Sequence, residues 1–190
     1  MEEALATRTQ EKMQEVLMDP SAPGPAVHYY MIRGGSKVGN ITVWQPGTVG
    51  GEYIKAYGHY HRGDWVETYQ VLSGEGLALL QKRVSKADPT IIEDFRVIKV
   101  KAGDTVEVPI RYGHLFVNTG TTYLVTNDDS PVAQADSADM PLHADYEPVK
   151  LMHGFAYYVV ERNGAPALIK NPRYKDVQKT NFGGLPVVEA

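Results

Sequence analysis

The segment 58–67 carries residues whose types and spacing suit metal chemistry. It reads Gly-His-Tyr-His-Arg-Gly-Asp-Trp-Val-Glu, so His59 and His61 are one residue apart and Glu67 follows six positions later. On a β-strand, side chains at i and i+2 point to the same face, so two imidazoles can reach one ion. Residues 62–64 predict a turn, after which a return strand would bring Glu67 beside the histidines. The alternative is that these histidines are ordinary surface or hydrogen-bonded side chains.

A second strand–turn–strand unit supplies a possible fourth ligand. It contains a glycine, a proline, a histidine and an asparagine at regular spacing, namely Gly103, Pro109, His114 and Asn118. With Gly74 after Glu67, the two units resemble the paired motifs of the cupin superfamily, although Arg111 stands where many cupins carry glycine. The resemblance implies an all-β fold, a cupin double-stranded β-helix (jelly-roll barrel), with His114 facing the first motif.

The composition fits one soluble globular domain. The 190 residues are 43% hydrophobic and 22% charged and include no cysteine, which excludes disulfides, Cys-ligated zinc and iron–sulfur sites. No apolar run approaches the ~18 residues of a membrane span, and the N-terminus lacks a signal-peptide pattern, so we expect a cytoplasmic protein. The net charge of −4, with no Lys/Arg-rich run, disfavours nucleic acid or a membrane as partner.

The chain divides into three expected parts. Residues 2–18 are good helix formers and residues 19–25 are rich in proline, which predicts a short N-terminal helical arm and linker over 1–25. A frayed tail is the alternative. Short β-prone runs punctuated by Gly, Pro and Asp predict the barrel over 26–175. The tail 176–190 is expected to carry little structure.

Two details of the barrel region are also predicted. Residues 130–145 form a long polar loop, and such loops are often functional or mobile. Residues 157–162, a turn at Asn163-Gly164 and residues 167–170 predict a terminal hairpin.

A closer resemblance extends over residues 27–175. Three sets of residues carry it: 46–52 before the Gly-His-Tyr-His run, Asp145-Tyr146 before Gly154-Phe155, and the Asn163-Gly164 hairpin followed by 170–174. Together they resemble the cupin-type glucose-6-phosphate isomerases. That family interconverts glucose 6-phosphate and fructose 6-phosphate, binds one divalent metal ion per barrel and forms homodimers.

The resemblance implies roles for individual residues. The implied metal ligands are His59, His61, Glu67 and His114, and the implied substrate-pocket residues are Thr42, Gly58, Tyr69 and Tyr146. We add His143, which lies one residue further from Asp145-Tyr146 than the family histidine, and Arg111, on the turn before His114. Nitrogen and carboxylate ligands suit Fe²⁺, our first expectation, and also Mn²⁺, Ni²⁺, Co²⁺ or Zn²⁺. A sugar phosphate is the expected substrate, in a homodimer.

The catalytic residues expected for aldose–ketose isomerisation are Glu67 and Tyr69. Glu67 would be the general base of an enediol route, and Tyr69 would hydrogen-bond a substrate oxygen, although it could equally be a packing residue. A direct hydride shift is the other route. His28 and His153 have no partner motif and are interpreted as structural.

Two other functions remain open at this stage. Three histidines and a glutamate also serve non-haem metal cupin dioxygenases, and a non-catalytic sugar-binding cupin would use its metal structurally. The Tyr, Thr and Arg residues near the motif favour a polyol substrate over an apolar one.

Overall fold

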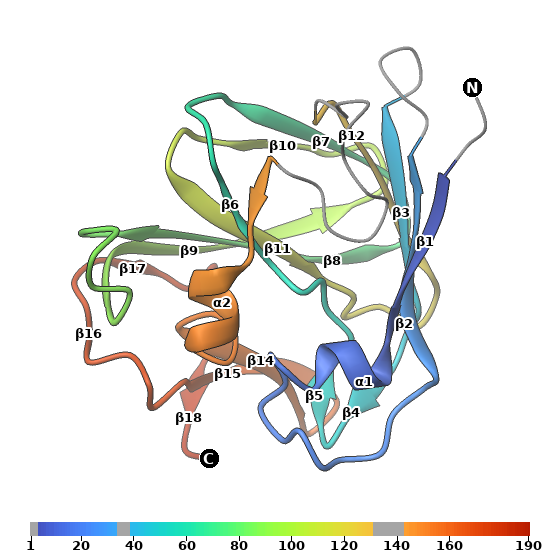
Figure 1. The fold of residues 1–190 in the computed structure, drawn as a ribbon. Helices are drawn as coiled ribbons and strands as arrows, with labels where there is room; N and C mark the ends of the chain where they lie inside the picture. The colour runs from blue at the N-terminus through green and yellow to red at the C-terminus, as the bar shows by residue number, and fades with distance from the viewer. Residues whose placement is uncertain (1–3, 34–38, 131–142) are drawn as a thin grey trace.

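The computed structural model describes residues 4–33, 39–130 and 143–190. Two sheets supply the walls of a barrel, and buried side chains fill the space between them (Figure 1). The first sheet has six strands, in the spatial order β1 (Ala4–Thr9), β2 (Val27–Arg33), β3 (Asn40–Trp44), β12 (Leu124–Asp128), β7 (Glu67–Ser73) and β10 (Thr105–Val108). The second sheet contains β11 (Tyr112–Val117), β8 (Glu75–Arg83), β9 (Ile91–Lys101) and the short strands β16 (Asp176–Val177) and β17 (Thr180–Asn181).

Two further sheets, one of two strands and one of five, accompany the barrel walls. One pairs β6 (Tyr60–His61) with β13 (Ala144–Asp145). The other contains β4 (Thr48–Val49), β5 (Glu52–Tyr53), β14 (Tyr157–Arg162), β15 (Ala165–Lys170) and β18 (Val187–Val188). The two helices are short: α1 spans Gln10–Met13 and α2 spans Glu147–Leu151.

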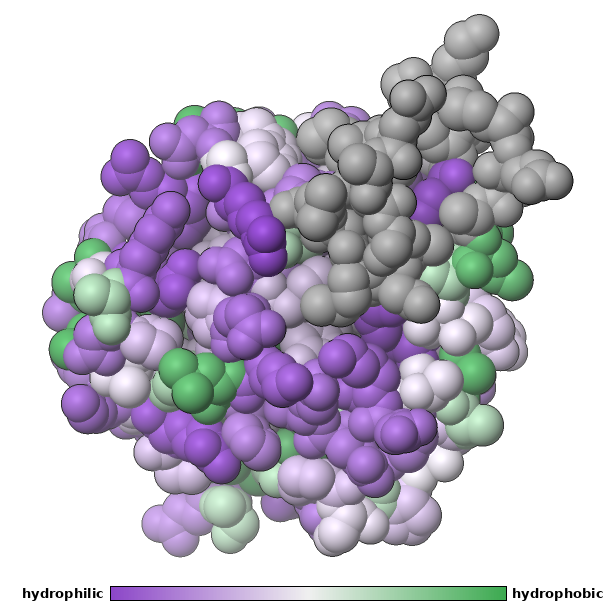
Figure 2. All heavy atoms as spheres, in the orientation of Figure 1, coloured by the Kyte–Doolittle hydropathy of each residue, from purple (hydrophilic) through white to green (hydrophobic). Residues whose placement is uncertain are grey.

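The core follows from alternation along the strands. In β7 the side chains of Glu67, Tyr69 and Val71 are buried, whereas those of Thr68 and Gln70 face outward, as the period of two requires. All six residues of β11 are buried, because this strand is covered on both faces. Hydrophilic side chains dominate the visible outer face, with small hydrophobic patches between them (Figure 2).

The N-terminal segment differs from the helical arm that its composition predicts. Helix is present only over Gln10–Met13, and Ala4–Thr9 instead pairs antiparallel with β2 as a strand of the six-stranded sheet. The reason is tertiary: β2 offers an unpaired edge, and pairing with it outweighs a weak local preference for helix. The side chains of Ala6 and Arg8, two residues apart on this strand, are both buried.

The C-terminal tail also carries more structure than expected. Residues 176–190 contribute β16 and β17, which pair in parallel with β9, and β18, which pairs in parallel with β15. The predicted hairpin forms as β14 and β15, and Asn163 (φ 54°) and Gly164 (φ 77°) adopt the positive φ of a tight turn. Of the predicted polar loop, residues 131–142 lie outside the described residues.

A buried ion pair fixes the N-terminal segment to the barrel. Lys55 Nζ lies 2.5 Å from Glu52 Oε1 and donates to the carbonyl oxygen of Val16 at 2.6 Å, while Glu52 Oε2 accepts from the amide of Met18 at 2.8 Å.

No helix in the described part of the chain is long and apolar enough to cross a membrane. A cytoplasmic location stays a prediction.

Candidate functional site

Four side chains from three parts of the chain converge inside the barrel. They are His59, His61, Glu67 and His114, and one ligand atom from each lies within 4.8 Å of every other. His61 ends β6, Glu67 begins β7, and His59 forms an isolated antiparallel bridge with His114 of β11. The turn after His61 therefore returns the chain so that Glu67 lies beside it, as its spacing predicts.

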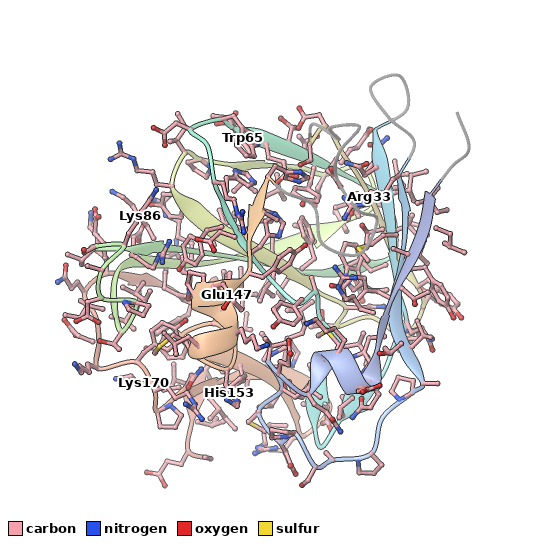
Figure 3. All side chains as sticks on the ribbon, in the orientation of Figure 1. Arg33, Trp65, Lys86, Glu147, His153 and Lys170 are labelled. Atoms are coloured by element: carbon pink, nitrogen blue, oxygen red, sulfur yellow. The ribbon has the colours of Figure 1, made fainter. Side chains whose placement is uncertain are left out.

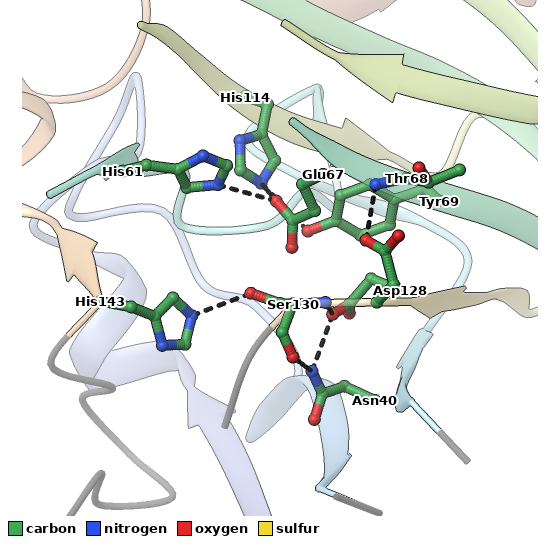
Figure 4. Close-up of polar contacts among 10 residues, drawn as sticks. Asn40, His61, Glu67, Thr68, Tyr69, His114, Asp128, Ser130 and His143 are labelled. Atoms are coloured by element: carbon green, nitrogen blue, oxygen red, sulfur yellow. Dashed lines mark hydrogen bonds and ion pairs between the residues drawn. The ribbon is translucent and has the colours of Figure 1, made fainter. Parts of the chain in front are cut away.

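The Glu67 carboxylate lies between two of the histidines. Its Oε2 is 2.9 Å from His61 Nε2 and 3.0 Å from His114 Nε2 (Figure 4). Ligand atoms about 2.1 Å from one ion, in neighbouring positions of an octahedron, lie ~3.0 Å apart. The Nε2 atom of His59 is buried and has no hydrogen-bond partner in the structure. The donor set and its spacing therefore fit one divalent ion.

Electrostatics keeps Glu67 and His59 in their metal-binding protonation states. Burial raises the pKa of Glu67, but His114 and His61 beside it outweigh burial and hold that pKa well below its usual value. Burial also lowers the pKa of His59 far below normal, so its imidazole is neutral. An ionised carboxylate and a neutral imidazole are the forms that ligate metals.

Gly58 shapes the backbone just before the first ligand. It has φ 82°, in the left-handed region, and a Cβ there would lie 3.0 Å from the ring of Phe155 and 3.2 Å from Leu115. Glycine is the residue that accepts this conformation without strain. The turn at Gly58 thus directs His59 into the pocket.

His59, Glu67 and His114 form one side of a pocket with about 550 Å³ of empty space, which includes open solvent, whereas His61 lines a second cavity. Five of the six predicted substrate residues line this pocket: Thr42, Gly58, Tyr69, His143 and Tyr146. The Tyr69 hydroxyl is 3.0 Å from His114 Nε2, and the Tyr146 ring centroid is 5.2 Å from that of His59.

Arg111, the sixth predicted substrate residue, lies on a different cavity. That cavity is lined by Tyr60, Lys82, Arg83 and Glu93, among others. The Arg111 side chain is 70% exposed, and its Nε lies 3.7 Å from Asp64 Oδ1. Its φ of 69° explains why glycine is common at this position in cupins, since few other residues adopt that conformation at low cost.

Sequence reasoning missed several polar residues of the pocket. Asp128 is buried on β12, and its Oδ1 accepts from Asn40 Nδ2 at 2.7 Å and from the Ser130 amide at 3.1 Å (Figure 4). Ser130 Oγ in turn lies 3.0 Å from His143 Nε2. Asp128 ends β12, and alternation with the buried Leu124 and Thr126 points it inward, but no motif marks it as a site residue.

Two further side chains lie near the metal ligands or in the pocket lining. The Trp65 ring stacks on His61 with centroids 4.4 Å apart, which restricts the imidazole orientation. Arg33, at the end of β2, also lines the pocket. His28 is buried and lies 2.5 Å from Gln10 Oε1, outside the pocket lining, in keeping with a structural role.

An all-β barrel that encloses three histidines and a glutamate on its inner face defines the cupin class, and the predicted fold class is thereby confirmed. A sequence model of the family described as "Glucose-6-phosphate isomerase (GPI)" matches residues 28–175. The chain belongs to the glucose-6-phosphate isomerase family, which confirms the resemblance seen in the sequence and the prediction of an isomerase.

Named relatives agree with this assignment. The chain is 32% identical over 170 residues to "Glucose-6-phosphate isomerase" of Pyrococcus abyssi, covering 87% of this chain and 80% of that one. It is 33% identical over 136 residues to the Pyrococcus horikoshii protein of that name, covering 71% of this chain and 63% of the relative. The chain thus matches less than two thirds of the second relative's length.

Among solved structures, the "Drosophila melanogaster CENP-C cupin domain" is similar with a TM-score of 0.39 and 13% identity, covering 56% of this chain and 70% of that one. So low a score does not by itself define the fold.

Proposed function

We propose that the protein is a metal-dependent aldose–ketose isomerase that interconverts glucose 6-phosphate and fructose 6-phosphate. One observation carries the proposal: three members of the metal-ligand cluster, His59, Glu67 and His114, line the same pocket as Tyr69, His143 and Tyr146. A divalent ion bound by the four ligands would supply Lewis acidity, which favours the charge that develops on the substrate oxygens. Family membership supports the choice of substrate.

The residues around the cluster suit proton transfer between neighbouring carbons. Glu67 is a buried, ionised carboxylate and is the proposed general base that removes the C2 proton and returns one to C1. Burial and the Glu67 charge raise the pKa of Tyr69 well above normal, so its phenol keeps its proton and can donate to a substrate oxygen. Thr42, Gly58, His143 and Tyr146 are proposed to position the sugar.

Metal content and activity test this proposal together. Purified wild-type protein loaded in turn with Fe²⁺, Mn²⁺, Ni²⁺, Co²⁺ or Zn²⁺ should convert fructose 6-phosphate to glucose 6-phosphate in a coupled assay. His61→Ala should lose the ion by elemental analysis, because it removes one of four ligands. The matched control His153→Ala changes a histidine outside the cluster and should keep full occupancy. A metal-loaded wild type without turnover would refute the isomerase.

A homodimer is the proposed assembly. The supporting observation is that β1 forms one edge of the six-stranded sheet, where its outer backbone groups can pair with another strand. Light scattering should give about twice the 21.0 kDa mass of one chain. A mass of one chain at assay concentrations would overturn the dimer and leave the proposed reaction unaffected.

A further inference from the structure

Four inward-facing side chains form a row across the six-stranded sheet. The register places Arg33 of β2 opposite Asn40 of β3, Asn40 opposite Asp128 of β12, and Asp128 opposite Tyr69 of β7. Arg33, Asp128 and Tyr69 all line the pocket. The row therefore begins beside the metal ligands, at Tyr69, and ends at a guanidinium three strands away.

Arg33 lacks the partners that the rest of the row has. Tyr69 contacts His114, and Asn40 donates to Asp128, whereas within the described part of the chain the Arg33 side chain donates only from Nη2 to the thioether sulfur of Met31, at 3.7 Å. Its Nε is buried without an acceptor, and no described carboxylate lies within ion-pair distance. A thioether is a weak acceptor, so the guanidinium retains strong unused donors.

The wall that carries Arg33 is cationic. Arg8, only 3% exposed, occupies the inner face of β1 opposite Tyr29, which also lines the pocket. Both arginines act on the Tyr146 hydroxyl and partly offset the effect of burial on its pKa. The Asp128 carboxylate is the opposing charge, but Asn40 lies between it and Arg33 in the row and donates to its Oδ1.

We propose that Arg33 binds the phosphate group of the substrate at the end of the pocket farthest from the metal ligands. This inference rests on the proposed function. Neighbouring strands are about 4.8 Å apart, so the backbones of Arg33 and Tyr69 are roughly 14 Å apart, and both side chains line the pocket. An open-chain sugar phosphate with its reacting carbons at Glu67 then directs its phosphate to Arg33. The planar guanidinium fork matches two phosphate oxygens.

The other arginine near the active site is less suited to this role. Arg111 is exposed, already faces Asp64, and lines the second cavity instead of the metal-centre pocket. Figure 3 shows Arg33 and Lys86, one residue from each cavity, on opposite sides of the molecule in this view. Substitution of Arg33 and substitution of Arg111 are therefore expected to affect the binding of the same sugar phosphate differently.

Calorimetry with sorbitol 6-phosphate, an open-chain polyol phosphate that cannot isomerise, tests the assignment on metal-loaded protein. Arg33→Met should raise its Kd by roughly 10- to 100-fold, the scale of a hydrogen bond to a charged group. Arg33→Lys should fall between Arg33→Met and wild type, because it keeps the charge and loses the fork. Arg111→Met and the exposed, distant Arg162→Met remove the same charge and should leave the Kd within about twofold.

Steady-state kinetics gives a second measurement. Arg33→Met should raise the KM for fructose 6-phosphate more than it lowers kcat, with unchanged metal content and thermal midpoint. Wild-type affinity in Arg33→Met, an equal loss in Arg111→Met, or no binding of sorbitol 6-phosphate by the wild type would each overturn the inference. If the wild type isomerises fructose 6-phosphate while Arg33→Met keeps its affinity, only the role of Arg33 fails. A wild type without turnover refutes the proposed reaction, and the calorimetry still decides on Arg33.

Discussion

Two buried clusters of charged groups differ in how completely their polar atoms are satisfied. In the Glu52–Lys55 pair, the ammonium contacts a carboxylate and the Val16 carbonyl, lies 5.0 Å from the Tyr158 ring centroid, and both carboxylate oxygens have donors. In the His59–His61–Glu67–His114 cluster, the buried Nε2 atom of His59 has no hydrogen-bond partner in the structure. Both clusters are enclosed by the same barrel.

The contrast separates a structural ion pair from a binding site. Burying a polar group without a partner costs stability, so a chain tolerates it where a ligand supplies the missing interaction. The charged groups of the Glu52–Lys55 pair all have partners. Two of these partners, Val16 and Met18, belong to the N-terminal segment, so the pair holds that segment against the barrel. We therefore expect substitutions in the His59–His61–Glu67–His114 cluster to affect chemistry and substitutions in the Glu52–Lys55 pair to affect folding.

The largest expected effect is on turnover in Glu67→Gln. Glutamine keeps the shape and one neutral oxygen ligand but cannot accept the C2 proton. If the enediol route operates, kcat should fall by ~10²–10⁴-fold at saturating metal, the usual scale for general acid–base catalysis. Coupled-assay rates at increasing metal concentration measure this effect.

Isotope labelling distinguishes the two routes. On the enediol route, product made from C2-deuterated glucose 6-phosphate loses part of its label to water while the proton resides on the carboxylate. On the hydride route the label passes completely from C2 to C1. Complete retention together with rescue of Glu67→Gln by excess metal would eliminate the enediol route and leave the isomerase standing.

Lys55→Met tests the Glu52–Lys55 ion pair. It leaves Glu52, which is 1% exposed, as a buried charge without a counterion, so the free energy of unfolding should fall by about 3–5 kcal/mol. Burial raises the pKa of Glu52, and Lys55 opposes that rise, so removing Lys55 also favours protonation of Glu52. Urea unfolding of metal-free protein measures the loss.

The matched double variant Glu52→Leu/Lys55→Met should recover much of that loss, because no unpaired charge remains. Its recovery should be incomplete, since the Met18 amide loses its acceptor. A loss below ~1 kcal/mol in Lys55→Met, or reduced metal content in either variant, would contradict the division between the two clusters.

The sequence identifies the metal cluster better than the pocket around it. Most of the cluster forms within one turn of the chain, whereas the pocket wall depends on the pairing of strands that are far apart in the sequence. His59, His61 and Glu67 lie within nine residues and one turn, so strand alternation alone predicts their convergence. His114 required the motif resemblance, since its contact with His59 forms across two strands. The Arg33–Asn40–Asp128–Tyr69 row depends on the register of four strands, which local patterns do not specify.

The same reasoning explains the misjudged termini. Ala4–Thr9 is rich in residues compatible with helix, yet the free edge of β2 determines its conformation. The tail strands β16–β18 are two residues each and pair with distant strands, so no periodicity reveals them. Lys55 likewise reads as an ordinary exposed cation until the fold places Glu52 and Val16 around it.

The smallest expected effect concerns Asp128, a buried acid in the pocket beside the metal-ligand cluster. Burial, and then the Glu67 charge, raise the pKa of Asp128 to about 7, from about 3.9 when unfolded. Between these values the folded state holds a proton that the unfolded state has lost, so stability falls as pH rises from about 4 to 7. Asp128→Asn keeps an oxygen acceptor for Asn40 and the Ser130 amide and lacks the charge.

In metal-free protein, Asp128→Asn should therefore be more stable than wild type by roughly 1–2 kcal/mol at pH 8. This is less than the ~4 kcal/mol that about 1.4 kcal/mol per pKa unit gives for the whole shift, because the buried amide of asparagine brings N–H donors that need acceptors. The gain should shrink as pH falls and vanish near pH 4. The matched control Asp64→Asn removes the same charge from a side chain that is 65% exposed and should change stability little at any pH. Thermal unfolding across this pH range measures both.

Bound metal should reduce the gain, because the ion compensates the Glu67 charge that helps to raise the Asp128 pKa. If the stability difference between Asp128→Asn and wild type does not change with pH, Asp128 is ionised throughout this range. The pocket would then hold two buried carboxylates, Glu67 and Asp128, without loss of stability.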